Sequence, residues 1–363
     1  MKRRDFARSL LTLPLAAALP SAFAEAPTPD RIHMPDGGSI TDVPGLKAGH
    51  YTLKERPTGC TVLLCEKGAV AGVDVRGSAP GTRETDLLSP INSVQEVNAI
   101  LLSGGSAYGL DAATGVMRYL EEHNAGHKIG NIGVVPIVPA AILMDLGVGG
   151  FKVRPDAEAG YKACLAATNG PLAEGNIGAG AGATVGKMFG PKFFMKGGLG
   201  TASVKFGDTG IIVGAVVAVN AVGDVVNPHT GQVIAGARSE DGKGYRDSMA
   251  AMMSGYRVVV RPAANTTIGI VATNAAFNKT QMCKIAQMAH DGYARAINPV
   301  HTMGDGDTIF SMSTGTTDVK ADVSAIGAIA ATVMSRAIVR AVMQATSIPS
   351  LNIPACRDYP ARA

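Results

Sequence analysis

Hydrophobic residues in this chain gather into short runs that are typical of buried strands. Each run is rich in Val, Ile, Leu and Ala and is bounded by turn-forming residues such as Gly, Asn and Asp. The polar stretch 66–68 predicts a turn that joins the first two strands into a pair. The predicted strands cover residues 61–65, 69–75, 99–102, 201–205, 211–219, 256–261 and 268–272, with another that begins at Asp224.

Longer segments with apolar positions at helical spacing predict helices between these strands. The last of them is strongly apolar, but polar side chains recur along it (Arg336, Arg340, Gln344), so it predicts a packed surface helix and not a membrane span. Strands and helices that come in pairs favour an α/β architecture of layered sheets covered by helices. The predicted helices cover residues 107–123, 139–146, 156–167 with Asp156 as N-cap, 278–297 and 322–345.

Composition adds an aliphatic core and few charges to this picture. Of the 363 residues, 46% are hydrophobic and 17% are charged, and there is no Trp. This length allows one large domain or two ordinary ones, and because we find no internal repeat and no clean linker, we predict one domain over residues 41–363. The net charge of +4 is weak, and no Lys/Arg cluster lies outside the N-terminus, so we expect no nucleic-acid partner.

The cysteines suggest neither a disulfide framework nor a metal site. There are five, and none of their spacings matches a C-x-x-C or zinc pattern. Cys60 and Cys65 are expected on opposite faces of one strand-like run. We therefore interpret the cysteines as small buried hydrophobes and predict no metal and no cofactor.

The N-terminus is typical of an export signal. Arg3 and Arg4 precede an apolar stretch over residues 10–19, and Ala22-Phe23-Ala24 matches an A-x-A cleavage site. We predict a twin-arginine signal over residues 1–24, with an ordinary Sec signal as the alternative, and a periplasmic or secreted mature chain. Residues 25–40 are Pro-rich and predict a flexible lead-in. The apolar stretch is too short for a stable span, so no membrane association is expected after export.

The junction between Asn265 and Thr266 carries the sharpest chemical hypothesis. Thr266 follows a loop-like segment and begins an apolar strand, the place where a self-cleaving amidohydrolase keeps its nucleophile. Cleavage of this bond would give Thr266 a free α-amine beside its own hydroxyl, and that amine can act as the base for the hydroxyl. The alternative is that Thr266-Thr267 is ordinary strand sequence.

Four other residues could support such chemistry. Lys187 ends the glycine-rich run 175–187, which lacks Walker spacing and predicts close backbone approach rather than nucleotide binding. Asp305 and Asp307 flank a glycine and could position a hydroxyl, hold a substrate ammonium or balance Lys187. Asn220 ends an apolar strand and could donate its amide to an oxyanion. For each, a solvated loop lysine or simple turn formation is the alternative.

His290 and His301 invite comparison with a Ser-His-Asp site. No Gly-x-Ser-x-Gly elbow accompanies them, and His290 lies late in a predicted helix, where it is expected to cap or pack. Their spacing does not favour metal ligation either.

Many ordered motifs together resemble the DmpA-type self-processing peptidases, which include L-aminopeptidase/D-amino-acid esterases, β-peptidyl aminopeptidases and nylon-oligomer hydrolases. The resemblance covers nearly all of the expected mature chain, and the Asn-Thr junction and Asp-Gly-Asp-Thr run are most similar to the nylon-oligomer (6-aminohexanoate oligomer) hydrolase branch. The segments that carry it are 74–77, 81–86, 102–110, 138–143, 175–180, 265–269, 288–292, 294–297, 301–302 and 305–308.

This resemblance implies an αββα four-layer sandwich, similar to N-terminal-nucleophile hydrolases. It implies a cut after Asn265 into subunits 25–265 and 266–363 that stay together and assemble into a homo-oligomer. Thr266 would be the nucleophile, supported by Lys187, Asn220, Asp305 and Asp307 at the matching positions. Substrate-binding positions would include Tyr108 and Met144. Met144 stands where several relatives carry Tyr, and its side chain cannot donate a hydrogen bond.

The resulting hypothesis is a self-processing amidohydrolase or aminopeptidase for short peptides, amino-acid amides or related amide oligomers. In the precursor, Thr266 Oγ would attack the Asn265 carbonyl, and in the mature enzyme it would form an acyl-enzyme with a bound amide. The alternatives are an exported hydrolase that is not processed and a ligand-binding protein on the same scaffold.

Overall fold

The computed structural model describes residues 37–256 and 265–359. The expected signal peptide, most of the lead-in and most of the predicted strand 256–261 lie outside the described residues.

Nine strands form one hydrogen-bonded sheet, and its longest strand belongs to two layers. The order is β10-β11-β14-β16-β2-β4-β7-β3, with β1 paired to β2. The early part of β2 pairs with β1 and β4, and its last residues pair with β16. The strands are β1 (Lys47–Thr52), β2 (Gly59–Val75), β3 (Thr82–Arg83), β4 (Glu96–Ser103), β7 (Ala140–Ile142), β10 (Gly198–Lys205), β11 (Ile212–Asn220), β14 (Thr266–Ala275) and β16 (Thr308–Thr317).

The predicted hairpin over residues 61–75 is wrong, because β2 runs through without reversing. Its register against β4 shifts between Leu64 and Ala69, and Gly68 in that interval has φ of +91°. An irregularity with a left-handed glycine is typical of a β-bulge, which bends a strand and increases its twist. The polar residues 66–68 therefore mark a bend in one strand.

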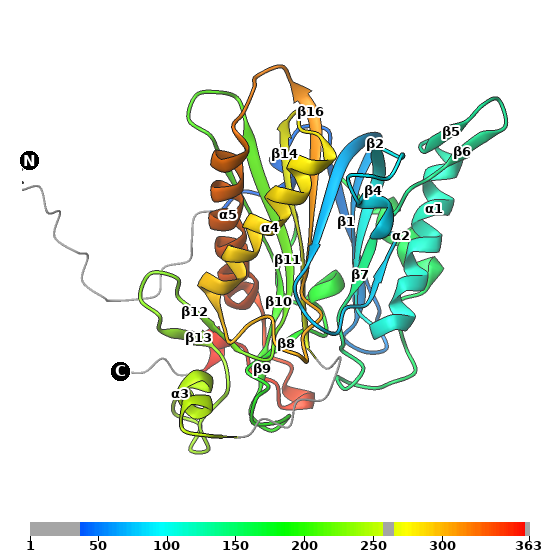
Figure 1. Cartoon of the computed structure of the whole chain (residues 1–363). Coiled ribbons are helices and arrows are strands. Elements are labelled where there is room, and N and C mark those ends of the chain that lie inside the picture. Colours follow the sequence, from blue (N-terminus) through cyan, green and yellow to red (C-terminus); the bar gives the residue numbers. More distant parts are fainter. Residues whose placement is uncertain (1–36, 257–264, 360–363) are drawn as a thin grey trace, which may run out of the picture. The chain divides into compact units, whose positions relative to one another are not determined.

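Helices cover the outer faces of both layers. Figure 1 shows α4 and α5 on one side of the strands and α1 and α2 on the other. Helix α5 packs on β10 and β11, and α2 packs on β1 and β2. These contacts confirm the expected α/β sandwich with αββα layers. The helices are α1 (Ala112–Glu122), α2 (Ala157–Leu165), α3 (Ser248–Met253), α4 (Lys279–Ala296) and α5 (Val323–Gln344).

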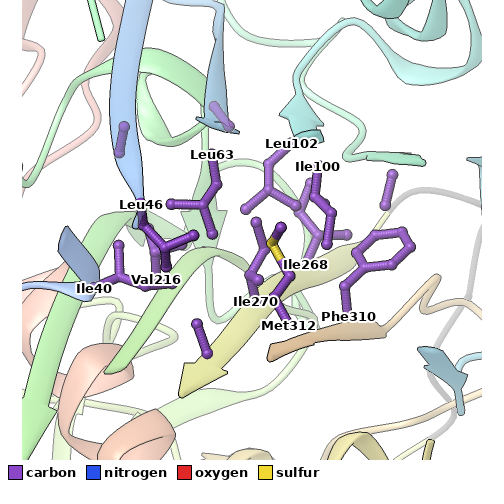
Figure 2. Close-up of a cluster of buried hydrophobic side chains, with 14 of the residues drawn as sticks. Ile40, Leu46, Leu63, Ile100, Leu102, Val216, Ile268, Ile270, Phe310 and Met312 are labelled. Atoms are coloured by element: carbon purple, nitrogen blue, oxygen red, sulfur yellow. The ribbon is translucent and has the colours of Figure 1, made fainter. Parts of the chain in front are cut away.

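Between the two layers lies the larger buried core. Alternate residues of β14 and β16 (Ile268, Ile270, Phe310, Met312) meet residues of β2 and β4 such as Leu63 (Figure 2). The opposite faces of β2 and β4 pack on α1 and α2 as a second core, which contains Cys60, whereas Cys65 belongs to the first. The expected placement of these two cysteines on opposite faces is confirmed, and all five cysteines are free.

Most predicted helices are confirmed, with one exception. Residues 139–146 contain the short strand β7, which runs parallel to β4, and not a helix. A short, fully apolar run cannot be assigned to helix or strand from its periodicity. Asp156 caps α2 as expected, since its carboxylate accepts the Ala159 N–H at 2.9 Å.

The C-terminal helix α5 is long and apolar enough to cross a membrane if only its length and composition are considered. It packs instead against β10, β11 and α4, and 67% of its most apolar window is buried inside the molecule. At Gly269 of β14, an added Cβ would lie 2.8 Å from Tyr293 Oη and 2.9 Å from Met334 Cε. The sheet therefore needs a glycine there to let α4 and α5 approach.

The remaining strands form small ribbons outside the main sheet. Those nearest the candidate site are β8, which lies within the glycine-rich segment and pairs with β9, and β12, which lies just after β11. The ribbon strands are β5 (His127–Ile129), β6 (Gly133–Val135), β8 (Thr184–Val185), β9 (Met195–Lys196), β12 (Asp224–Val226), β13 (Val233–Ala235) and β15 (Ile297–Asn298).

Candidate active site

The topology brings three strand ends together at one edge of the larger core. Asn220, the last residue of β11, pairs with Thr266, the first residue of antiparallel β14. Strand β16 runs parallel to β14, and its first residue, Thr308, pairs with Ile268. Asp305 and Asp307 precede Thr308 and therefore lie beside the start of β14.

The alternation of side chains along the strands separates Thr266 from Thr267. Thr266 shares a face with Ile268 and Ile270, which point into the core between the layers. By the same argument, Asn220 shares that face with Ala218. Thr267 lies on the opposite face, so only the first threonine of the pair points toward the space between the layers.

Thr266 is buried, with 2% of its surface exposed. In the uncut chain its hydroxyl donates a hydrogen bond to the carbonyl oxygen of Asn265. The same oxygen accepts the backbone N–H of Gly306 at 3.0 Å. A Cβ on Gly306 would lie 2.9 Å from Thr266 Oγ and 2.6 Å from the carbonyl oxygen of Ala79, so the backbone here is packed directly against the junction.

The two aspartates have different environments. Asp307 accepts the N–H of Thr267 on one carboxylate oxygen at 2.7 Å. Asp305 Oδ2 accepts the backbone N–H and the hydroxyl of Thr302 at 2.9 and 2.6 Å, whereas its Oδ1 is buried and has no hydrogen-bond partner among the described residues. Burial, and then the neighbouring charge of Asp307, raise the pKa of Asp305 to about 6.

Lys187 and Asn220 form the other side of the site. Lys187 Nζ donates to the backbone oxygen of Asn220 at 2.9 Å and to its Oδ1 at 2.7 Å. Burial lowers the pKa of Lys187 to about 7, although Asp305, Asp145 and Asp307 oppose this shift. The ammonium is therefore titratable near neutral pH, unlike an ordinary lysine.

Of the two predicted substrate-binding residues, Met144 contacts Asn220 directly, whereas Tyr108 lies at the surface. The carbonyl oxygen of Met144, which follows β7, accepts a hydrogen bond from Asn220 Nδ2 at 3.1 Å and so links the two layers. Tyr108 lies in the short 3-10 helix Ser106–Asp111 and is 54% exposed. Its ring lies 3.8 Å from the Arg154 guanidinium and meets Phe151 edge-on.

A buried ion pair next to Met144 was not predicted from the sequence. Arg56 donates to Asp145 Oδ1 at 2.8 Å, and both side chains are essentially inaccessible. Thr58 Oγ and the Gly105 N–H donate to the same carboxylate at 2.6 and 2.9 Å. A cation and an anion so far apart in the sequence leave no local pattern, so only a structure could pair them.

A second buried lysine supports the glycine-rich segment. Lys196 is fully buried, and its Nζ donates to the carbonyl oxygens of Gly180, Ala183 and Gly197 at 2.8, 2.9 and 3.1 Å. Burial lowers the pKa of Lys196 to about 7. The expected close approach of the glycine run is also present, since a Cβ on Gly180 would lie 2.2 Å from the backbone nitrogen of Leu199.

His301 contacts the site, although no role was predicted for it beyond the rejected comparison with a Ser-His-Asp site. Its Nδ1 donates to Asp307 Oδ2 at 2.9 Å. His290 does pack, since it is fully buried and its Nε2 donates to the carbonyl oxygen of Asp74 at 3.0 Å. The signal available in the sequence was the position of His301 just before the Asp305–Asp307 segment. Within the described residues, no cluster of His, Cys, Asp and Glu is suited to hold a metal ion.

Comparison with known proteins agrees with the fold. Residues 38–353 match the family model of peptidase family S58. An uncharacterized aminopeptidase of Mycobacterium bovis is 43% identical over 346 residues, covering 88% of this chain and 97% of the relative. A 6-aminohexanoate-oligomer endohydrolase of Paenarthrobacter ureafaciens is 32% identical over 315 residues, covering 83% of this chain and 84% of the relative.

A solved structure supports the same fold. The L-aminopeptidase D-Ala-esterase/amidase of Ochrobactrum anthropi, a variant of the N-terminal-nucleophile hydrolase fold, matches with a TM-score of 0.64 at 19% identity, covering 88% of this chain and 90% of that one. The fold and the relatives together define an amide-bond hydrolase of the aminopeptidase and amidase class. The chain belongs to peptidase family S58, which confirms the resemblance found in the sequence.

Proposed function

We propose that this chain cuts itself between Asn265 and Thr266, and that Thr266 then serves as an N-terminal nucleophile for amide hydrolysis. The observation that carries the proposal is the arrangement at the junction. The Thr266 hydroxyl lies against the carbonyl group it would attack, and the Gly306 N–H polarises the same carbonyl oxygen from 3.0 Å. A backbone N–H at this distance can stabilise the negative charge that develops on that oxygen during attack.

Processing would begin with attack of Thr266 Oγ on the Asn265 carbonyl carbon. The C–N bond to Thr266 then breaks, the nitrogen takes up a proton, and an ester joins Asn265 to the Thr266 side chain. Water hydrolyses this ester and leaves a carboxylate on Asn265 and a free α-amine on Thr266. Lys187, with its pKa near 7, is the group we assign as proton acceptor for the first step.

The mature enzyme would repeat this chemistry on a bound amide. The free α-amine has a reference pKa of about 7.7–8.0, so it can accept the hydroxyl proton near neutral pH. Lys187, when protonated, would lower that pKa further by like-charge repulsion. Asn220 would donate to the oxyanion, and Asp305 and Asp307 would orient Thr266 and its ammonium form. Tyr108 and Met144 would border the substrate.

The substrates we propose are short peptides, amino-acid amides or related amide oligomers. The relatives described as aminopeptidase and as 6-aminohexanoate-oligomer endohydrolase support this range. We also propose that residues 1–24 direct twin-arginine export to the periplasm and that processed units form a homo-oligomer. Replacement of Arg3 and Arg4 by Lys, followed by fractionation, tests the export, and light scattering tests the assembly.

An intact-mass spectrum of the denatured, freshly purified protein tests the central proposal. Two species that sum to the mature chain plus one water are expected, the smaller beginning at Thr266. Thr266→Ala should give one species, and Thr267→Ala, on the opposite face of the strand, should still be processed. One uncut wild-type species that hydrolyses amides would instead identify a hydrolase that is not processed.

A further inference from the structure

Asp307 joins the loop before β16 to the start of β14, and His301 holds it in place. The backbone N–H and the Nδ1–H of His301 both donate to Asp307 Oδ2, at 3.1 and 2.9 Å. The other carboxylate oxygen accepts the Thr267 N–H. Asp307 is 1% exposed, so these are the contacts that fix the orientation of a buried carboxylate. Hydrogen bonds to a charged acceptor are among the stronger ones in proteins.

The backbone of His301 is held in an unfavourable conformation. Its φ is +57°, in the left-handed region that is uncommon for residues other than Gly, although Asn, Asp and His adopt it more often than the rest. Its ring is near-parallel to that of Tyr293, with centroids 5.9 Å apart, and meets the His290 ring edge-on at 4.8 Å. Both neighbours are fully buried. A strained residue that is fixed on so many sides is characteristic of functional sites.

The loop that His301 begins contacts the junction on both sides of the bond to be cut. Gly306 donates to the carbonyl of Asn265, and Asp307 accepts from the amide that follows Thr266. Within the loop, Thr302 is bonded to Asp305. Rotation of Asp307 would therefore release the Thr266–Thr267 peptide and loosen the loop that carries Gly306.

We propose that His301 is a positioning residue that acts through Asp307 to hold the Asn265–Thr266 junction in its attack geometry. This inference rests on the proposed self-processing. The Thr266 hydroxyl is hydrogen-bonded to the Asn265 carbonyl oxygen and not to His301, whose Nε2 is buried and has no hydrogen-bond partner among the described residues.

Three substitutions at this position separate the hydrogen bond from the backbone strain. In His301→Asn, the side-chain amide can donate near the position of Nδ1, and Asn tolerates a positive φ. His301→Gly also tolerates this φ but lacks the donor. His301→Asp has the size of Asn but presents a carboxylate to Asp307.

Processing is followed by intact mass at intervals after cell-free synthesis, and thermal unfolding is measured for each variant. Loss of a hydrogen bond to a charged group slows processing of His301→Gly by about 10–100-fold. His301→Asn is expected within about threefold of wild type, and His301→Asp at least as slow as His301→Gly. If His301→Gly fails to fold, the contrast between the isosteric Asn and Asp variants decides the question.

The two proposals fail in different ways. An uncut wild-type chain would contradict self-processing itself, with Thr266→Ala as the uncut reference. A wild-type chain that is cut at the same rate as folded His301→Gly, or as His301→Asp, would overturn the role of His301. Equal slowing in all three variants would also overturn it, because rescue by Asn is what distinguishes a hydrogen-bonding role from a merely structural one.

Discussion

Asn220 and Thr266 face each other as antiparallel partners at the ends of β11 and β14. Directly opposed residues in such a pair have Cβ atoms about 4.5–5.5 Å apart. Lys187 Nζ and the Thr184 N–H both donate to Asn220 Oδ1, which turns Nδ2 toward the other layer, where the Met144 carbonyl oxygen accepts one of its two hydrogens. The amide of Asn220 is therefore oriented by three contacts beside the nucleophile.

Substitution of Asn220 by Ala should lower kcat/KM for amide substrates. Loss of one oxyanion donor costs about 10²–10³ in rate, with most of the loss in kcat. The measurement is steady-state hydrolysis of a chromogenic amino-acid amide by the processed variant, with cleavage checked first by mass. A processed Asn220→Ala enzyme with wild-type kcat would show that the oxyanion is stabilised elsewhere.

Processing should depend on pH through Lys187. Because burial lowers the pKa of Lys187 to about 7, the neutral amine that can accept a proton is lost as the pH falls below 7 and gained as it rises above it. The cell-free processing rate is expected to rise through pH 7 and then level off. Lys187→Arg stays charged throughout and should be processed far more slowly at every pH. A wild-type rate that does not change between pH 6 and 8 would contradict this role.

Lys196 should make the folded state more stable as the pH rises above 7. Its pKa is about 7 in the folded chain and about 10.4 when unfolded, so between these values the unfolded state binds more protons and the free energy of unfolding increases with pH. The contribution is at most about 1.4 kcal/mol per pH unit.

The comparison uses urea unfolding of unprocessed Thr266→Ala with and without Lys196→Met, at pH 7, 8 and 9. Lys196→Met should be less stable overall, because three buried carbonyl oxygens lose their donor. The diagnostic result is a smaller increase of the free energy of unfolding with pH in the protein that carries Lys196→Met. Equal slopes with and without this substitution would place the pKa of Lys196 outside this range.

The buried Arg56–Asp145 pair should be costly to break. Arg56→Met leaves a buried carboxylate without its cation, which typically costs about 3–5 kcal/mol in the free energy of unfolding. The matched control is Lys47→Met, which removes a largely exposed pair with Glu66 and should cost at most about 1 kcal/mol. Chemical denaturation of both variants in the unprocessed background measures the difference. Equal losses would mean that the pair contributes no more than a surface one.

The layered architecture could be predicted from the sequence because its strands and helices have clear periodicity and caps. The predicted ranges 211–219 and 278–297 differ from β11 and α4 by one residue at each end. The two errors, at residues 66–68 and 139–146, have local causes. A polar Gly-containing triplet marks either a turn or a bulge, and a short apolar run fits helix or strand equally well.

The grouping of Thr266, Asn220, Lys187, Asp305 and Asp307 was suggested by the resemblance, and the structure brings these residues together. Their catalytic roles stay predictions. The supporting contacts could not be found in the sequence, because they depend on tertiary proximity. The Arg56–Asp145 pair joins distant segments, and the role of Gly306 is carried by a backbone N–H that any residue type but proline has.

Strands β14 and β16 lie in the middle of the sheet, with β11 on one side and β2 on the other. A cut just before β14 therefore gives two polypeptides, neither of which contains a complete sheet. Refolding after denaturation would become a bimolecular reaction, dependent on concentration, whereas the uncut chain folds as one molecule. After cleavage of this bond, the stability of the enzyme would be kinetic and would no longer rest on reversible folding. Its lifetime would then be set by its rate of unfolding.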